Sequence, residues 1–365
     1  MAYECREMIQ YLENEAPKRQ PDGLHVKNVT CKFFTDVVMR CGFGVYGNSF
    51  IESEATLQKF GEEFATFGMW KTGRILLAFF AHNMPTFLRT RLMDINEQNF
   101  FRLLITELIQ YRERNRVFRN DYLQMLMHIK NMGIIIKGKN TIRVAGITIE
   151  YTDEDIASHA LTFFLTGCEL PSNTLTCALY ELALNPEIQI RLRAEIDSVL
   201  TRHCGGLTYD AVSEMSFLDM VLKETMRKYP ACPMMFRLCT KSCQFPLPDG
   251  GNFILEKGTA INIPVEGIQM DSEYFSEPEK FDPERFSEER KDSIKHFTFL
   301  PYGGGPRQCF GIKFGEAMMK AGIVAIVSHF EIRTTPKTPV KIVKDPCTFM
   351  LPPKGGMWLN FVRRQ

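Results

Sequence analysis

The sequence predicts a mainly α-helical protein with a small β region. Apolar residues recur at helical spacing through most of the first two thirds of the 365 residues. From about residue 230 the composition changes to short runs rich in Pro, Gly and β-branched residues, which favour turns and short strands. There is no internal repeat and no low-complexity linker. A single domain over residues 1–365 is therefore the simplest organisation.

The expected helices are the segments with sustained apolar periodicity. Asn185-Pro186 separates two of them, because proline is tolerated in the first turn of a helix but not in its interior. Another helix is expected from about Phe310 to Phe330, directly after a glycine-rich loop. The remaining expected helices cover 32–40, 54–68, 95–116, 119–130, 153–182 and 185–201.

Within the β region, which starts from about residue 230, the segment 243–265 shows the pattern most plainly. Residues 243–265 combine β-branched residues with Pro and Gly, and Glu256-Lys257-Gly258 is expected to form a hairpin turn. Residues 277–286, EPEKFDPERF, carry two prolines and are expected to be irregular. The C-terminal CTFMLPPKGGMWLNFV is expected to form two short strands around a turn.

Composition and charge exclude several classes of protein. Lys and Arg number 44 and Asp and Glu 43, so a net charge of +1 does not fit a bulk nucleic-acid binder. The N-terminus has no apolar signal-peptide core, and no apolar run approaches the ~18 residues of a membrane-spanning helix. The 11 cysteines include no C-x-x-C pair and predict reduced thiols in a reducing compartment. Cys239 and Cys243 are spaced one residue too far for the usual zinc or redox motif.

One loop concentrates the features that a metal–thiolate site requires. Residues 301–311 read PYGGGPRQCFG. A thiolate ligand needs amide donors and a backbone that can approach the metal, and the glycines at 303–305 permit unusual backbone angles. Pro306 stiffens the loop, and the helix expected after Cys309 directs its free amides towards the sulfur. Taken alone, the loop also fits a glycine-rich turn with an incidental buried cysteine.

This loop resembles the haem loop of the cytochrome P-450 family of haem-thiolate oxygenases, F-x-x-G-x-R-x-C-x-G. The matching residues are Tyr302 (where Phe is usual), Gly305, Arg307, Cys309 and Gly311. The resemblance implies that Cys309 ligates the iron of haem b and that the loop, with Tyr302, Gly303, Arg307 and Gly311, binds the cofactor. The similarity extends over residues 1–365 and is strongest to animal microsomal members, particularly insect xenobiotic-metabolising ones.

Two further motifs support the resemblance. Glu224 and Arg227 in LKETMRKYP match the family's E-x-x-R, and their spacing of three places both on one helix face. Arg285 in FDPERF matches the third member of a charge network that braces the loop region behind the haem. Arg237 matches a strand arginine that contacts a haem propionate in similar proteins, as Arg307 does.

The family's long central helix, [A/G]-G-x-[D/E]-T-[T/S], is matched by TGCELP at 166–171. By resemblance Gly167 lets the helix approach the haem and Glu169 occupies the acidic catalytic position. Leu170 replaces the threonine whose hydroxyl helps deliver protons during oxygen activation, and Pro171 follows it. Because Pro171 has no amide hydrogen, the carbonyl of Gly167 is left free to hold a water that partly replaces the hydroxyl. The alternative is drift in a chain that tolerates poorer coupling and leaks electrons to peroxide.

The resemblance also places a substrate pocket beside the haem. Its expected wall is apolar, which suits a small apolar substrate. The segments 233–236 and 346–350 equally fit ordinary core packing. The expected pocket residues are Phe163, Phe164, Thr166, Pro233, Met234, Met235, Phe236, Thr348 and Phe349.

The match begins part-way into the family's chain, so the sequence is expected to be an N-terminally truncated, incomplete haem-thiolate oxygenase domain without the membrane anchor, first sheet strands and early helices. The tract 75–88, ILLAFFAHNMPTFL, matches a loop that dips into the membrane surface in similar proteins; a core helix is the alternative. The resemblance implies a location at the cytoplasmic face of the endoplasmic reticulum membrane.

The activity implied is that of a monooxygenase, which inserts one oxygen atom from O2 using electrons from NADPH through a reductase. Lys313 and Lys320 are candidate contacts for that reductase, or simply lie on a solvated helix face. Two alternatives stay open. One is a haem-thiolate isomerase or lyase that acts on a peroxide without a reductase, which Leu170 favours slightly. The other is a non-catalytic truncated form with poor haem retention.

Overall fold

A computed structural model describes residues 1–51, 73, 95–132, 134–136, 139–144, 147–247, 249–343 and 354–364. Several sequence expectations lie outside these residues: the helix at 54–68, the tract 75–88, the first of the two C-terminal strands, and the pocket residues Thr348 and Phe349.

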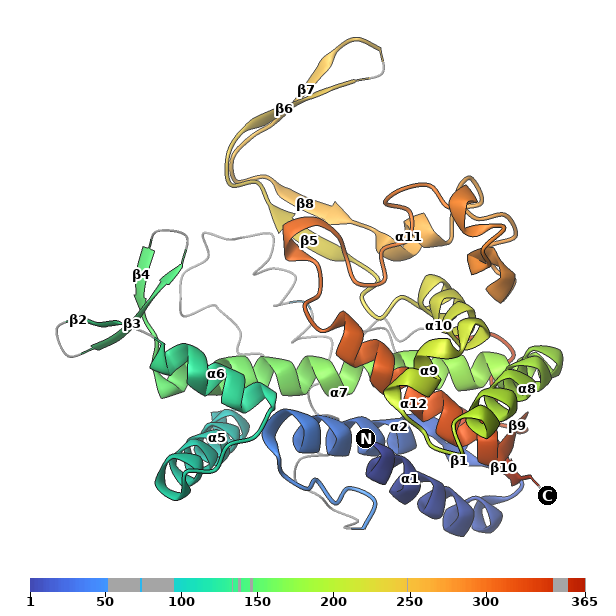
Figure 1. Cartoon of the computed structure of the whole chain (residues 1–365). Helices are drawn as coiled ribbons and strands as arrows, with labels where there is room; N and C mark the ends of the chain where they lie inside the picture. Colours follow the sequence, from blue (N-terminus) through green and yellow to red (C-terminus); the bar gives the residue numbers. More distant parts are fainter. Residues whose placement is uncertain are drawn as a thin grey trace.

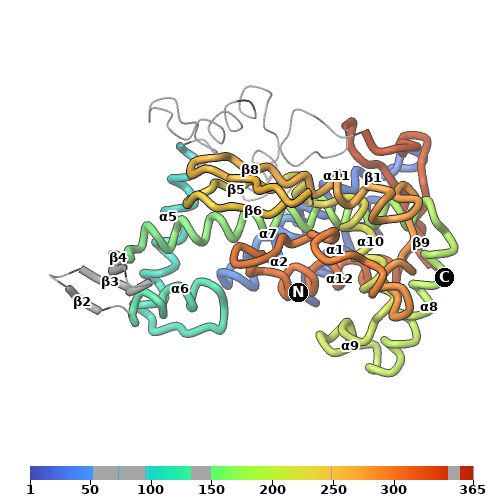
Figure 2. Tube along the Cα trace, turned by 90° about the horizontal axis from the view of Figure 1, so that it is seen from above, coloured from blue at the N-terminus to red at the C-terminus, as the bar shows by residue number. Residues whose placement is uncertain are grey.

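The long helix α7 (Asp153–Leu184) runs across the middle of the molecule (Figure 1). A capping box fixes its start, because the Thr152 hydroxyl accepts the Asp155 amide at 3.3 Å and the Asp155 carboxylate accepts the Thr152 amide at 2.7 Å. In Figure 2, α6 lies at one end of α7, and α8 and β9 lie at the other.

Helices account for most of the described chain, which confirms the predicted fold class. The N-terminal helix (α1) and two short helices (α9 and α11) were not among those predicted. The other helices in chain order are α1 (Ala2–Glu15), α2 (Val26–Val38), α5 (Ile95–Asn115), α6 (Tyr122–Asn131), α8 (Pro186–Arg202), α9 (Tyr209–Glu214), α10 (Ser216–Lys228), α11 (Val265–Gln269) and α12 (Ile312–His329).

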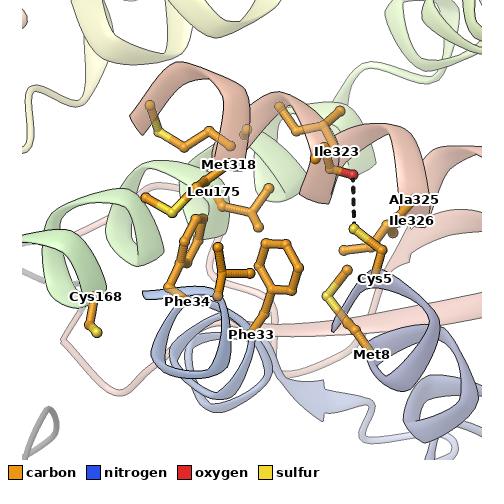
Figure 3. Close-up of a cluster of buried hydrophobic side chains, with 14 of the residues drawn as sticks. Cys5, Met8, Phe33, Phe34, Cys168, Leu175, Met318, Ile323, Ala325 and Ile326 are labelled. Carbon is orange, nitrogen blue, oxygen red and sulfur yellow. Dashed lines mark hydrogen bonds between the residues drawn. The ribbon is translucent and has the colours of Figure 1, made fainter. Parts of the chain in front are cut away.

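The main core lies where α2 and α12 pack against α7 (Figure 3). Phe33 of α2 and Leu175 of α7 are fully buried there. A Cβ at Gly322 of α12 would stand 2.9 Å from Leu175 and 3.2 Å from Phe33, so the glycine allows the three helices to approach closely.

The strands form small antiparallel sheets. The first sheet has the strand order β1 (Leu24–His25), β10 (Trp358–Arg363), β9 (Phe330–Thr334). The second has the strand order β2 (Ile134–Ile136), β3 (Lys139–Val144), β4 (Ile147–Glu150). Two hairpin-like pairs follow α10: β5 (Met235–Leu238) with β8 (Ala260–Ile263), and β6 (Cys243–Pro246) with β7 (Asn252–Leu255).

Strand pairing differs from the sequence prediction at two places. The turn at 256–258 is present, but β7 and β8 on its two sides do not pair with each other: β7 pairs with β6 and β8 with β5. Gly258, at φ +92°, turns the chain from one pair to the other. Phe330 starts β9 instead of ending the last helix, and β10 pairs with β9 and β1. Residues 277–286 are largely irregular, with one 3₁₀ turn at Pro283–Phe286.

No described helix has the length and apolar character that crossing a membrane requires.

Candidate functional site

A cavity of about 290 Å³ lies between α7, the loop before α12, and the start of β5. Cys309, the cysteine of the loop motif, is on its wall. Most of the remaining wall is apolar, and it includes Met318 and Met319 of α12. The cavity is therefore an apolar site with one thiol and a small number of polar groups at its edge.

The loop around Cys309 is held by its own backbone. The Cys309 amide donates to the carbonyl of Tyr302 at 3.0 Å, which closes the loop. The Gly311 amide donates to the Cys309 sulfur at 3.3 Å, and such a donor stabilises negative charge on sulfur. Gly303 and Gly305 both have φ of +71°, a conformation that other residues rarely adopt. The glycines are therefore required by the turn that carries the thiol.

Two arginines bring positive charge to the same cavity. Arg237 reaches it from β5 and Arg307 from the loop. Arg237 donates to the carbonyl of Phe236 at 2.9 Å. Within the described ranges, no carboxylate pairs with either guanidinium. Two uncompensated positive charges beside an apolar cavity attract an anionic group at its edge.

One face of α7 forms the opposite wall. Residues 163, 166, 167, 170, 171 and 174 recur at helical spacing along it. The Thr166 hydroxyl donates to the carbonyl of Thr162 at 2.7 Å, and the Thr174 hydroxyl donates to that of Leu170 at 3.2 Å. Pro171 lies inside the helix without breaking it. It offers no amide to the carbonyl of Gly167.

Gly167 lines the cavity, but a side chain there would meet α2. Its Cβ would stand 3.1 Å from a methyl of Val38. The glycine therefore serves the packing of α7 against α2, which the motif alone did not reveal.

Glu169 is not on the cavity wall among the described residues. Its side chain is 1% exposed and forms an ion pair with Lys27 of α2 at 2.9 Å. Asn173 donates to the same carboxylate oxygen at 3.0 Å. Burial opposes the charge on Lys27, but Cys31 and Glu169 outweigh it, so the pKa of Lys27 is raised. The structure thus separates Glu169 from Cys309, and it adds Lys27 as a partner that the sequence did not indicate.

The predicted pocket residues that the structure describes divide into two groups, those on the cavity wall and those away from it. Phe163, Thr166 and Met235 lie on the cavity wall. Phe164 is fully buried and packs on Phe101, with ring centroids 5.3 Å apart. Among the described residues, the structure does not place these predicted members on the wall: Phe164, Pro233, Met234 and Phe236.

The cavity also includes residues that the sequence analysis missed. Four of them lie on one face of α12 at helical spacing after Cys309, and this spacing could have predicted them: 314, 315, 318 and 319. Cys232 and Met226 carry no comparable signal, because their neighbours are typical of ordinary core.

Glu224, Arg227 and Arg285 meet in one buried cluster. Arg227 donates twice to Glu224, at 2.7 and 2.9 Å, and Arg285 donates to it at 3.3 Å. The Asp282 amide also donates to Glu224, at 2.9 Å. Arg227 further donates to the carbonyl of Pro278 at 2.8 Å, which ties α10 to residues 277–286. Every charge in the cluster is thus paired, as burial requires.

Gln269 extends this cluster to the loop before Cys309. Its side-chain amide donates to the carbonyl of Arg227 at 2.9 Å, and its oxygen accepts the Leu300 amide at 2.8 Å. No sequence motif indicated this buried residue. The contacts join the charge cluster to the thiol loop through a single side chain.

The groups on the cavity fit a haem. A cysteine sulfur with an amide donor is a ligand for iron, two guanidiniums suit anionic side groups, and the apolar walls suit a flat macrocycle.

The comparisons with known proteins agree with this fit. The family model described as "Cytochrome P450" matches residues 1–360. The chain is similar to cytochrome P450 6k1 of Blattella germanica, with 34% identity over 98% of this chain and 69% of the relative. It is also similar to probable cytochrome P450 6a13 of Drosophila melanogaster (35%; 95% and 67%) and probable cytochrome P450 9f2 of the same fly (32%; 99% and 69%). A match of this extent, together with the thiol loop and the buried charge cluster, shows that the chain belongs to the cytochrome P450 family of haem-thiolate monooxygenases.

Proposed function

We propose that this protein inserts one oxygen atom from O2 into a small apolar substrate, with Cys309 as the protein ligand to haem iron. NADPH supplies two electrons through a reductase, and the second oxygen atom leaves as water. The observation that carries the proposal is the shared cavity, which combines the Cys309 thiol, two guanidiniums and the apolar face of α7.

The residues of the thiol side hold and orient the cofactor. Cys309 would bind iron through its sulfur, and the Gly311 amide would moderate the charge on that sulfur. Arg237 and Arg307 would pair with the propionates. When bound, haem supplies the activation of dioxygen. As the ligand, the Cys309 sulfur would donate electron density to the iron.

The residues of α7 shape the space for substrate and control protons. Phe163 and Leu170 exclude water from the site. The threonine hydroxyls at 166 and 174 lie one helical turn on either side of Leu170. The Gly167 carbonyl, which Pro171 leaves without an amide partner, would accept a hydrogen bond from a water molecule. That water would partly replace the hydroxyl missing at 170.

The charge cluster positions the thiol loop. Arg227 and Gln269 connect α10 to residues 277–286 and to the amide of Leu300. These bonds hold the loop in place when its cavity is filled. The cluster touches no substrate, so its role is positional.

The proposed reductase would dock beside the start of α12, and the proposed site of action is the cytoplasmic face of the endoplasmic reticulum membrane. Lys313 is exposed there and available to a partner's carboxylate. Lys320 is only 12% exposed and forms an ion pair with Asp219 at 2.6 Å. The expectation that Lys320 contacts a reductase therefore lacks structural support. By similarity to insect relatives, the substrates would be xenobiotics.

A second candidate activity is the rearrangement of a peroxide substrate without a reductase. One observation favours it: Leu170 leaves the α7 face without a hydroxyl at the position opposite the thiol loop. The two oxygen atoms of a peroxide are already partly reduced, so its rearrangement does not require protons to be delivered to dioxygen.

The test begins with the absorption spectrum of purified, reduced protein with carbon monoxide. The red-shifted band of thiolate-ligated iron is expected. Soluble protein without this band would overturn the proposal and leave a form that does not retain haem. Turnover with NADPH and reductase, compared with turnover of an organic hydroperoxide alone, separates the two activities.

A further inference from the structure

A pair of cysteines outside the haem cavity lies at the junction between the two strand pairs that follow α10. Cys239 follows the last residue of β5, and Cys243 is the first residue of β6. Cys239 is buried and Cys243 is exposed, and both are free thiols. β6 and β7 extend away from the body of the molecule beyond β5 and β8 (Figure 1), which leaves Cys243 accessible to small solutes.

Backbone contacts fold the segment between the two cysteines back on itself. The Cys239 sulfur donates to the carbonyl of Lys241 at 3.2 Å and to that of Leu255 at 3.7 Å. Leu255 is also the ladder partner of Cys243. One residue of β7 therefore touches the first cysteine and pairs with the second.

The backbone of Cys239 is fixed from the other side. Its amide donates to the carbonyl of Thr259 at 2.9 Å, and its carbonyl accepts the Gly258 amide at 2.7 Å. The Lys257 amide donates to the Ser242 hydroxyl at 3.0 Å. The two cysteines thus lie at the ends of a well-bonded turn and not on a free loop.

The thiols also influence each other. Desolvation raises the pKa of the Cys243 thiol, and the negative charge of a Cys239 thiolate and a side-chain hydrogen bond with Cys239 raise it further. Because the thiolate is the nucleophile, attack by Cys243 should speed up as pH rises.

We propose that Cys239 and Cys243 are a modification site at which hydrogen peroxide forms a reversible intramolecular disulfide. The exposed Cys243 thiolate attacks one peroxide oxygen, and the O–O bond breaks to give a sulfenic acid and, after protonation, water. The Cys239 thiolate then attacks the sulfur of Cys243, and the hydroxyl leaves as a second water. Each sulfur loses one electron, and the peroxide gains two.

The disulfide has a consequence for the haem cavity, and this consequence rests on the proposed function. β5 ends at Leu238, next to Cys239, and it carries Met235 and Arg237 to the cavity wall. Linking Cys239 to Cys243 restricts the end of β5. The oxidised protein should therefore hold Arg237 more firmly against the haem edge.

The chemistry is tested on the purified full chain treated with hydrogen peroxide at several pH values. Free thiols are then alkylated, and the protein is digested with trypsin. Lys241 lies between the cysteines, so the disulfide would join the peptides 238–241 and 242–257. We expect this linked pair, less the two thiol hydrogens, to form faster at higher pH and to disappear with dithiothreitol.

Two variants make the result specific. Cys243→Ser should abolish the linked pair, and Cys204→Ser, which removes another exposed thiol, should leave it unchanged. The proposal is overturned if Cys239 remains fully alkylated after peroxide while Cys243 is converted to sulfinic acid. It is also overturned if Cys243 links to other cysteines as often as to Cys239.

The effect on the cavity has its own readout. Transfer of haem to apomyoglobin should be roughly threefold slower from peroxide-treated than from untreated protein, because the closed loop restricts β5. In Cys243→Ser the two rates should be equal. Equal rates in a wild-type sample that contains the disulfide would overturn the link to the cavity. If the protein takes up no haem at all, the proposed function fails while the peptide result still decides the modification site.

Discussion

The two walls of the cavity differ in how their polar groups are arranged. On the thiol side, Cys309 is supported by backbone bonds, and the cluster around Arg227 satisfies every buried charge. On the α7 side the polar groups are already engaged by other partners. Glu169 pairs with Lys27, and the threonine hydroxyls donate to their own helix. The thiol side is thus built to hold a cofactor rigidly, whereas the α7 side offers few groups for proton transfer.

The largest expected effect comes from the thiol itself. Cys309→Ser should abolish the red-shifted carbon monoxide band, because an alcohol is not a thiolate ligand. Cys232→Ser changes another thiol on the same cavity wall and should keep the band. Survival of the band in Cys309→Ser would show that another residue ligates the iron.

The next largest effect is expected for the charge cluster on the thiol side, where a substitution should lower the free energy of unfolding. Arg227→Met leaves Glu224 buried without its main partner, and we expect a loss of about 3–5 kcal/mol in the free energy of unfolding. Urea unfolding measures it. Arg290→Met is the matched control, since Arg290 is 46% exposed in its ion pair with Asp282 and should cost at most ~1 kcal/mol. Similar losses in both variants would remove the special role of the cluster.

A substitution on the α7 side should change the fraction of NADPH that is used to form product, with little effect on stability. Leu170→Thr restores a hydroxyl to the cavity wall, so more NADPH should be used for product and less for hydrogen peroxide. Product and peroxide per NADPH measure this, with Leu184→Thr as a control on an exposed part of the same helix. Unchanged yields in Leu170→Thr would exclude residue 170 from the mechanism.

The smallest expected effect is a change of stability with pH that arises in α2, the helix that packs against α7. Burial raises the pKa of Asp36 from 3.8 to about 6, although its carboxylate accepts the Ser49 amide. The folded state then binds the proton more tightly than the unfolded state, so this contribution to stability is present below pH 3.8 and is lost as pH rises to about 6. Across that range, wild type should lose about 2 kcal/mol relative to Asp36→Asn. Urea unfolding of both proteins across this pH range measures the difference in their free energies of unfolding. A difference that stays the same at every pH would contradict the prediction.

Much of the thiol side was predictable because its motifs act through nearby backbone. The glycines at 303 and 305 adopt the positive φ that the loop requires, and Cys309 lies on the cavity wall. The α7 side was less predictable. The spacing of 163, 166 and 170 marks one helix face, but Phe164 and Glu169 adjoin that face in sequence and point elsewhere.

By itself the sequence determined the helical fold class, the thiol loop and the positions of the three charged residues behind it. These depend on local spacing, on glycine's backbone freedom and on charges that must be paired when buried. Only the tertiary structure decided that α2 takes Glu169 away from the cavity, and that β8 pairs with β5 while Leu255 of β7 contacts the Cys239 sulfur. Packing between elements distant in the chain sets these outcomes, and no short window of sequence contains both partners.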